Sequence, residues 1–77
     1  MTQPSDDDLI AYLERNPGSG LRALCVAFDL PCTYEDDDYP GQRFYTHAAK
    51  ALAGQLQRLR RQRRIKTTQG QRWEAQT

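Results

Sequence analysis

Few side chains in this sequence combine into a pattern that could carry catalysis. The sequence has a single histidine, His47, and its acidic residues are scattered rather than spaced for catalysis with it. No serine–histidine–aspartate set, glycine-rich phosphate loop or metal cluster accompanies it. A chain of 77 residues is expected to fold as one domain over residues 1–77, with little room for a deep cleft built from several loops. We therefore expect a protein that is not an enzyme and needs no cofactor.

The two cysteines and one acidic run are the remaining candidates for metal chemistry. Cys25 and Cys32 are separated by a spacing that fits no standard zinc pattern, and His47 lies well away from both. The run Glu35–Asp38 lacks the alternating ligand spacing of a calcium-binding EF-hand. Neither a signal peptide nor an apolar run of membrane-spanning length is visible. We therefore predict free thiols, no metal, no membrane association and a cytoplasmic location.

Charge is divided between the two halves of the chain, although the formal net charge is only +1. Residues 1–42 hold nine acidic and two basic side chains, whereas residues 43–77 hold nine basic and one acidic side chain. Such segregation is typical of a protein that binds a nucleic acid or an acidic partner. Neutralisation of one half by the other within the fold is the alternative explanation.

The basic half is dominated by segment 46–64, which is predicted to be a strongly basic amphipathic helix. Thr46 can cap its start. Apolar residues then recur at spacings of three and four, and the buried stripe they make is Ala49, Leu52, Leu56 and Leu59. The opposite face combines cations, amides and small residues: His47, Lys50, Ala51, Gly54, Gln57, Arg58 and Arg61. Gly54 costs a helix about 1 kcal/mol against alanine, so it is either a tolerated defect or a place of close approach by another backbone.

Two shorter helices are expected before this basic helix. The first covers residues 7–15 after a flexible terminus at residues 1–5. The turn Asn16-Pro17-Gly18 ends it. The second covers residues 20–28, with Ser19 as its N-cap. Both carry their apolar residues on one face, so each is expected to bury that face.

Two further segments are expected to lie outside the helices. Residues 31–45 show no helical or strand period and are predicted to form a long acidic loop. This loop is either solvated or in contact with a basic surface, of a partner or of the chain's own basic helix. Residues 65–75 are predicted to form a β-hairpin. If Ile65 lies opposite Trp73, the turn falls at residues 68–70 and both apolar side chains face the helices.

The order helix, helix, basic helix, hairpin resembles the winged-helix family of DNA-binding domains. The first helix of the motif and its turn correspond to Leu24-Cys25-Val26-Ala27-Phe28-Asp29-Leu30. The recognition helix, which leads into the wing, is carried by Leu52, Leu56, Leu59 and Ile65. The resemblance covers about residues 9–75 and rests on apolar spacing and element order. Two features depart from the family. The connection at 31–45 is long, and Arg63 stands where a glycine usually ends the third helix. The basic helix is expected to end near Gln62.

The resemblance implies a mainly α fold with a small β-hairpin: three helices followed by a two-stranded wing. It implies binding of double-stranded DNA, as in a small transcriptional regulator or accessory factor. Helix 46–62 would lie in the major groove, and hairpin 65–75 would contact the backbone or minor groove. Thr46 would hold a phosphate at the helix N-terminus. The DNA-contact candidates are Thr46, His47, Lys50, Ala51, Gly54, Gln55, Gln57, Arg58, Arg61, Arg64, Lys66 and Arg72.

Other binding partners remain as alternatives. A protein-interaction module on the same scaffold would bind a partner protein through the acidic residues 35–38 or through the basic helix. Basic helices also bind RNA phosphates. A homodimer that reads two half-sites is attractive because one module has a small footprint on DNA. Its interface is expected on the first helix, the tyrosine-rich loop or the hairpin edge.

Overall fold

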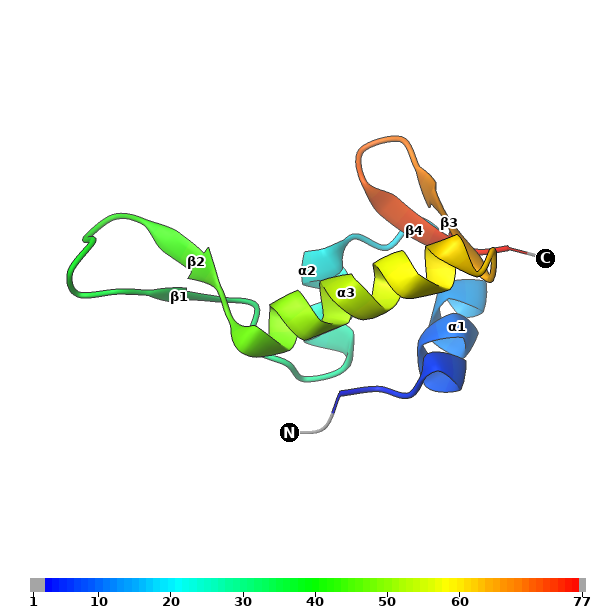
Figure 1. Cartoon of the computed structure of the whole chain (residues 1–77), viewed down its shortest axis with the longest axis horizontal. Helices are drawn as coiled ribbons and strands as arrows, with labels where there is room; N and C mark the ends of the chain where they lie inside the picture. The colour runs from blue at the N-terminus through cyan, green and yellow to red at the C-terminus, as the bar shows by residue number, and fades with distance from the viewer. Residues whose placement is uncertain (1–2, 77) are drawn as a thin grey trace.

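The computed structural model describes residues 3–76, which form three helices and two small antiparallel hairpins (Figure 1). The elements in chain order are α1 (Asp6–Arg15), α2 (Leu21–Ala27), β1 (Thr33–Glu35), β2 (Arg43–Tyr45), α3 (His47–Arg61), β3 (Ile65–Thr68) and β4 (Arg72–Ala75). The domain measures 44 × 27 × 20 Å. In the part of the chain that the structure describes, no helix has the length and apolar character needed to cross a membrane.

One apolar core joins the three helices to the C-terminal hairpin. The predicted stripe of α3 is buried in full, which confirms the helical period of that segment. The core residues are Leu9, Leu13, Leu24, Cys25, Leu30, Ala49, Leu52, Leu56, Leu59, Ile65 and Trp73. Because α3 contributes more of these residues than any other element, its orientation on the core decides which of its faces is free.

A side-chain hydroxyl caps the start of each of the two longer helices, α1 and α3. The Ser5 hydroxyl accepts a hydrogen bond of 3.1 Å from the Asp8 N–H at the start of α1. The Thr46 hydroxyl accepts one of 3.1 Å from the Ala49 N–H at the start of α3, as predicted. Residues 1–2 of the predicted flexible terminus lie outside the described residues. Gln3 and Pro4, which follow them, are tied to α3 by hydrogen bonds.

The last two helices, α2 and α3, each end with a left-handed residue that is not glycine. Arg63, with φ of 61°, follows the C-cap of α3, and its N–H donates to the Arg60 carbonyl. The Arg64 N–H donates to the Leu59 carbonyl over 3.0 Å, which completes a Schellman motif. Asp29, with φ of 55°, plays the same part after α2. The basic helix thus ends where it was predicted to end, with an arginine in the position that glycine usually takes.

Residues 31–45 are not the long loop predicted from the sequence, because strands β1 and β2 pair within them. Tyr34 lies opposite Phe44 and Glu35 opposite Arg43 in an antiparallel register. Figure 1 shows this hairpin standing off from the N-terminal end of α3. Strands of three residues are too short to display an alternating pattern, so the sequence showed no strand period.

The register of the C-terminal hairpin also differs from the prediction. Ile65 pairs with Ala75, and Thr67 pairs with Trp73, so the turn is residues 69–71. The difference is two residues, and side chains alternate with a period of two along a strand. Ile65 and Trp73 therefore still share the buried face, as predicted.

The segment between α1 and α2 is fastened to this hairpin. The Trp73 N–H donates to the Ser19 carbonyl over 2.8 Å, and the Ser19 N–H donates to the Trp73 carbonyl over 3.1 Å. Ser19 was predicted to be the N-cap of α2, and this prediction was wrong. Gly20 occupies that position without a side-chain bond. The bridge holds the hairpin against the helices at the end opposite the β1–β2 hairpin.

Candidate nucleic-acid interface

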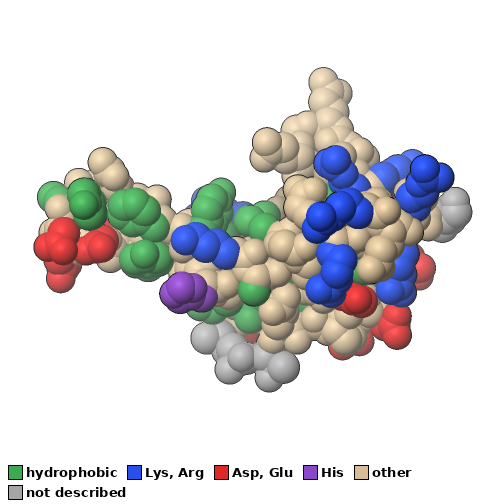
Figure 2. All heavy atoms as spheres, viewed as in Figure 1, with side chains coloured by type: hydrophobic (Ala, Val, Ile, Leu, Met, Phe, Trp, Pro, Cys, Tyr) green, Lys and Arg blue, Asp and Glu red, His purple; other side chains and the backbone are tan. Residues whose placement is uncertain are grey.

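The outward face of α3 is a basic surface about 22 Å long, since the helix has 15 residues. Its exposed residues are His47, Lys50, Ala51, Gly54, Gln57, Arg58 and Arg61. Figure 2 shows the histidine with a Lys or Arg side chain near one end of this face and a concentration of cations near the other. Small side chains occupy the middle, so the face has charge at both ends and a low profile between them.

Gln55 was predicted to contact DNA, but it is buried and only 5% exposed. Its Nε2 donates to the Pro4 carbonyl over 2.9 Å and to the Asp6 carboxylate over 2.8 Å. Its Oε1 accepts a bond of 2.8 Å from the Gln3 amide. The N-terminal segment thus covers a position that a helical pattern alone places at the edge of the exposed face. Gln55 is a structural residue and is removed from the candidate interface.

Thr46 is likewise occupied within the fold. Its hydroxyl donates to the Pro31 carbonyl and accepts from the Ala49 N–H, and its own N–H donates to the Cys32 carbonyl over 3.0 Å. Neither donor of Thr46 is left for the predicted phosphate contact. Its place in the site is to fix the start of α3 and the base of the β1–β2 hairpin.

Three of the predicted DNA-contact cations form ion pairs with the chain's own acids. The nitrogen–oxygen distances are 2.9 Å for Arg58–Asp6, 3.1 Å for Arg64–Asp7 and 3.1 Å for Lys66–Glu74. The cations in these pairs remain about half exposed, and surface pairs of this kind contribute roughly 0–1 kcal/mol. Lys50, Arg61 and Arg72 have no ion-pair partner among residues 3–76.

The Asp6 carboxylate is held in its charged form by the residues around it. The hydrogen bond from Gln55 is the largest effect and lowers the pKa of Asp6 below its ordinary value of 3.8. Burial, the second largest effect, opposes it, and the hydrogen bond of Arg58 and the positive charges of Arg58 and Arg64 lower the pKa further. The start of α1 is thereby anchored beside α3 in a charged state at neutral pH. Among residues 3–76, the ion pair that neutralises a cation of α3 lies on this side of the helix.

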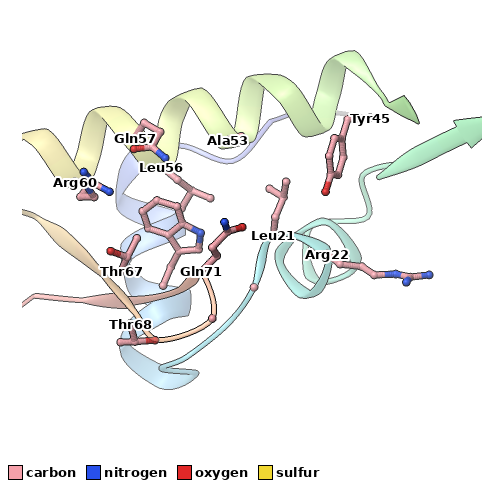
Figure 3. A pocket seen from close by; sticks show the side chains of 13 residues that line it. Leu21, Arg22, Tyr45, Ala53, Leu56, Gln57, Arg60, Thr67, Thr68 and Gln71 are labelled. Atoms are coloured by element: carbon pink, nitrogen blue, oxygen red, sulfur yellow. The ribbon is translucent and has the colours of Figure 1, made fainter. Parts of the chain in front are cut away.

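An open groove of about 590 Å³ lies on the other side of α3, between the start of α2 and the β3–β4 hairpin. Leu21, Leu56 and Trp73 supply apolar surface to it. Figure 3 shows Arg60 at one end of this groove and Arg22 at the other. Arg60, which is not among the predicted DNA-contact residues, is exposed at the groove. The sequence therefore missed two cations beside the helix face, because their positions depend on where the hairpin lies.

Of the two cysteines, Cys25 lies in the core and Cys32 packs against the core. Both are free thiols, Cys25 buried and Cys32 half-buried. Burial, together with a hydrogen bond and charge interaction with Cys32, raises the pKa of the Cys25 thiol from 9.0 to about 11. Among residues 3–76, no three histidine, cysteine or acidic side chains come together in a way that could hold a metal ion.

The acidic tip of the β1–β2 hairpin lies at the far end of the molecule from the C-terminal cations of α3 (Figure 2). It therefore leaves the face of α3 open in the view of Figure 2. Comparison with protein-family models, with curated protein sequences and with solved structures finds no match to this chain.

Proposed function

We propose that the chain is a DNA-binding protein of the winged-helix type, such as a small transcriptional regulator or accessory factor. The outward face of α3 would enter the major groove, and the β3–β4 hairpin would contact the backbone or minor groove. The observation that carries this proposal is the form of the α3 face: small residues in its middle, cations at both ends, and acidic neutralisation only along the side next to α1.

Gly54 supports this proposal most directly. A Cβ placed at this position would meet no heavy atom of residues 3–76 within 4 Å, apart from its own neighbours and the adjacent backbone of α3. Packing within the described part of the protein therefore gives no reason for a glycine in the middle of a helix, where it costs about 1 kcal/mol. A second surface that approaches α3 closely gives one. The floor of a DNA groove, reached between flanking phosphates, is such a surface.

The division of contacts follows from which cations are free. Lys50 and Arg61 would face bases or flanking phosphates, because neither is engaged in an ion pair among the described residues. Gln57, an exposed amide on the same face, would hydrogen-bond to base edges. Arg60 and Arg72 would contact phosphates toward the hairpin. The paired Arg58, Arg64 and Lys66 would exchange a carboxylate for a phosphate, a change that costs little because surface pairs are weak.

The order of elements and the Ser19–Trp73 bridge also support the family resemblance, since they place a hairpin directly beside the basic helix. The β1–β2 hairpin between α2 and α3 is an insertion relative to that pattern. It lengthens the connection without displacing α3 from the core.

The test is titration of labelled duplex DNA at about 50 mM and 200 mM salt with the wild type, Lys50→Ala and Arg61→Ala. Arg15→Ala is the matched control, because Arg15 is an exposed arginine on α1, outside α3 and the hairpin. We expect both α3 variants to bind more weakly and to lower the salt dependence by about one phosphate contact each, with the control unchanged. Absence of binding at low salt would overturn the proposal. Binding that ignores both α3 variants would exclude this face.

A further inference from the structure

The two thiols of this chain lie close together beyond the end of α2, and neither takes part in the proposed DNA contact. Cys25 belongs to the core, and Cys32 packs against that core. The chain turns back on Cys25 after α2, because the Leu30 N–H donates to the Cys25 carbonyl over 2.8 Å. Cys32 follows two residues later, near enough to raise the pKa of the Cys25 thiol through a hydrogen bond and through charge. The fold therefore brings together two sulfur atoms that it leaves as free thiols.

Cys32 is the member of the pair that a small reagent can reach. It is half-buried and lines a hollow of about 200 Å³ at the base of the β1–β2 hairpin. Arg22 and Arg43 line the same hollow, and Arg22 has no ion-pair partner among residues 3–76. Reactive cysteines are typically found in partly exposed, electropositive surroundings of this kind. Cys25 is fully buried, so it lies behind Cys32 as seen from the solvent.

Two neighbouring thiols can serve either a metal ion or a disulfide. A structural zinc site takes four ligands. In the part of the chain that the structure describes, no third histidine, cysteine or acidic side chain joins the two thiols in a group that could hold a metal ion. A disulfide needs only the two sulfur atoms. The pair is therefore better suited to oxidation than to metal binding.

We propose that Cys32 is an oxidation site for hydrogen peroxide and that Cys25 converts the oxidised form into an intramolecular disulfide. The Cys32 sulfur attacks one oxygen of the peroxide, so a sulfur–oxygen bond forms as the oxygen–oxygen bond breaks, and the departing hydroxide leaves as water with the thiol proton. The Cys25 sulfur then attacks the sulfenic acid on Cys32. A sulfur–sulfur bond forms, and the hydroxyl leaves as a second water with the Cys25 proton. The two thiols give up two electrons, which reduce the peroxide.

The disulfide would act at the point where α3 begins. The Cys32 carbonyl accepts a hydrogen bond of 3.0 Å from the Thr46 N–H, and the neighbouring Pro31 carbonyl accepts one from the Thr46 hydroxyl. A bond from Cys32 to Cys25 would tie this anchor to α2 and close the loop of residues 25–32. A cross-link restricts the unfolded chain, so the oxidised protein should unfold at a higher urea concentration than the reduced one.

The experiment exposes the folded, reduced full chain to hydrogen peroxide and follows its mass. Both cysteines fall in one tryptic peptide, residues 23–43, because the sequence has no lysine or arginine between Arg22 and Arg43. We expect this peptide to lose about 2 Da, the mass of two hydrogen atoms, in a chain that stays monomeric. The oxidised chain should resist alkylation until a reductant is added.

Cys25→Ser and Cys32→Ser are matched variants, since each replaces one sulfur atom by oxygen. Without Cys25 the sulfenic acid on Cys32 has no internal partner, so dimedone, a carbon nucleophile that traps sulfenic acids, should label the 23–43 peptide. Without Cys32 the remaining thiol is buried and should react with peroxide at least about tenfold more slowly. Circular dichroism confirms that each variant is folded. The wild type in denaturant is a comparison that needs no variant. There the ratio of disulfide to sulfinic acid should fall, because Cys25 is no longer held beside Cys32.

Oxidation of the folded wild type that ends as a sulfinic acid on Cys32, or as a disulfide between two chains, would overturn the proposal. So would a Cys32→Ser variant that reacts as fast as the wild type, or an oxidised protein that unfolds at a lower urea concentration than the reduced one. The site lies outside the outward face of α3 and the β3–β4 hairpin, so this inference does not rest on the proposed function. DNA titration of the reduced chain tests that function separately, and neither result decides the other.

Discussion

The side-chain amide of Gln55 donates a hydrogen bond of 2.8 Å to the Asp6 carboxylate and so joins the middle of α3 to the first turn of α1. The same amide binds the Pro4 carbonyl, and the Arg58 guanidinium reaches the same Asp6 oxygen over 2.9 Å. This small network orients α3 on the core and limits which of its cations are free. It also explains why a glutamine in a basic helix is not available to a ligand.

Gln55→Ala should lower stability and leave DNA affinity unchanged. The substitution leaves the Gln3 amide and the Pro4 carbonyl without their partner, and a lost buried hydrogen bond costs about 1–2 kcal/mol. Urea denaturation gives the free energy of unfolding, and DNA titration of the folded fraction gives the affinity. Gln57→Ala, a change of the same residue type on the exposed face, should show the reverse pattern. Loss of affinity without loss of stability in Gln55→Ala would return this residue to the interface.

The contribution of Asp6 should disappear in acid. Because its pKa is lowered in the folded state, the charged carboxylate stabilises the fold fully above pH 3.8, and this stability is lost as the pH falls below 3.8 through the lower pKa of the folded state. Asp6→Asn should therefore lower the melting temperature near neutral pH, and the difference from the wild type should shrink below pH 3.8. Asp8→Asn, one of the neighbouring aspartates, serves as the control. A difference that stays constant with pH would show that charge is not the cause.

Gly54→Ala should separate stability from binding. No other element of the described chain approaches the added methyl within 4 Å, so the variant should be more stable by up to about 1 kcal/mol. If a DNA groove approaches this position closely, affinity should fall by about tenfold, or about 1.4 kcal/mol. Ala51→Gly on the same face is the matched reverse change, expected to lose about 1 kcal/mol of stability and to keep its affinity. Unchanged affinity in Gly54→Ala would make this glycine a tolerated defect.

Arg63→Gly should stabilise the protein, because a left-handed conformation costs a non-glycine residue about 1–2 kcal/mol. We expect a gain of about 1 kcal/mol in the free energy of unfolding, with the helix content by circular dichroism unchanged. Arg61→Gly makes the same exchange inside α3 and should lose about 1 kcal/mol. A loss of stability in Arg63→Gly would mean that the arginine side chain contributes more than its backbone conformation costs.

The two thiols should differ in reactivity. Cys25 is buried and its pKa is raised to about 11, so its thiolate is scarce at pH 8, whereas Cys32 is half-buried. Alkylation followed by mass spectrometry should label Cys32 first, by about tenfold or more. The protein should also lose stability as the pH rises above 9.0, because the unfolded thiol releases its proton there and the folded one does so only at about 11. Equal labelling rates in the folded protein would contradict this order.

The sequence by itself determined the start, the end and the buried stripe of α3. Thr46 and Ala49 interact within one turn, and Leu52, Leu56 and Leu59 repeat with the helical period. These features depend on neighbours three or four residues away, so they can be read from local order. The exposure of Lys50 and Arg61 followed from the same period.

Only the tertiary structure decided which side chains of α3 are free to contact a ligand. Gln55 is buried by a segment about fifty residues earlier, and the acids of α1 pair with Arg58 and Arg64 across the same gap. Arg60 lies in a groove made by the hairpin. The short β1–β2 hairpin and the shifted register of Ile65 likewise depend on backbone pairing between strands. A helical period predicts which residues share a face of the helix. Contacts between segments distant in the chain decide which of those residues are covered.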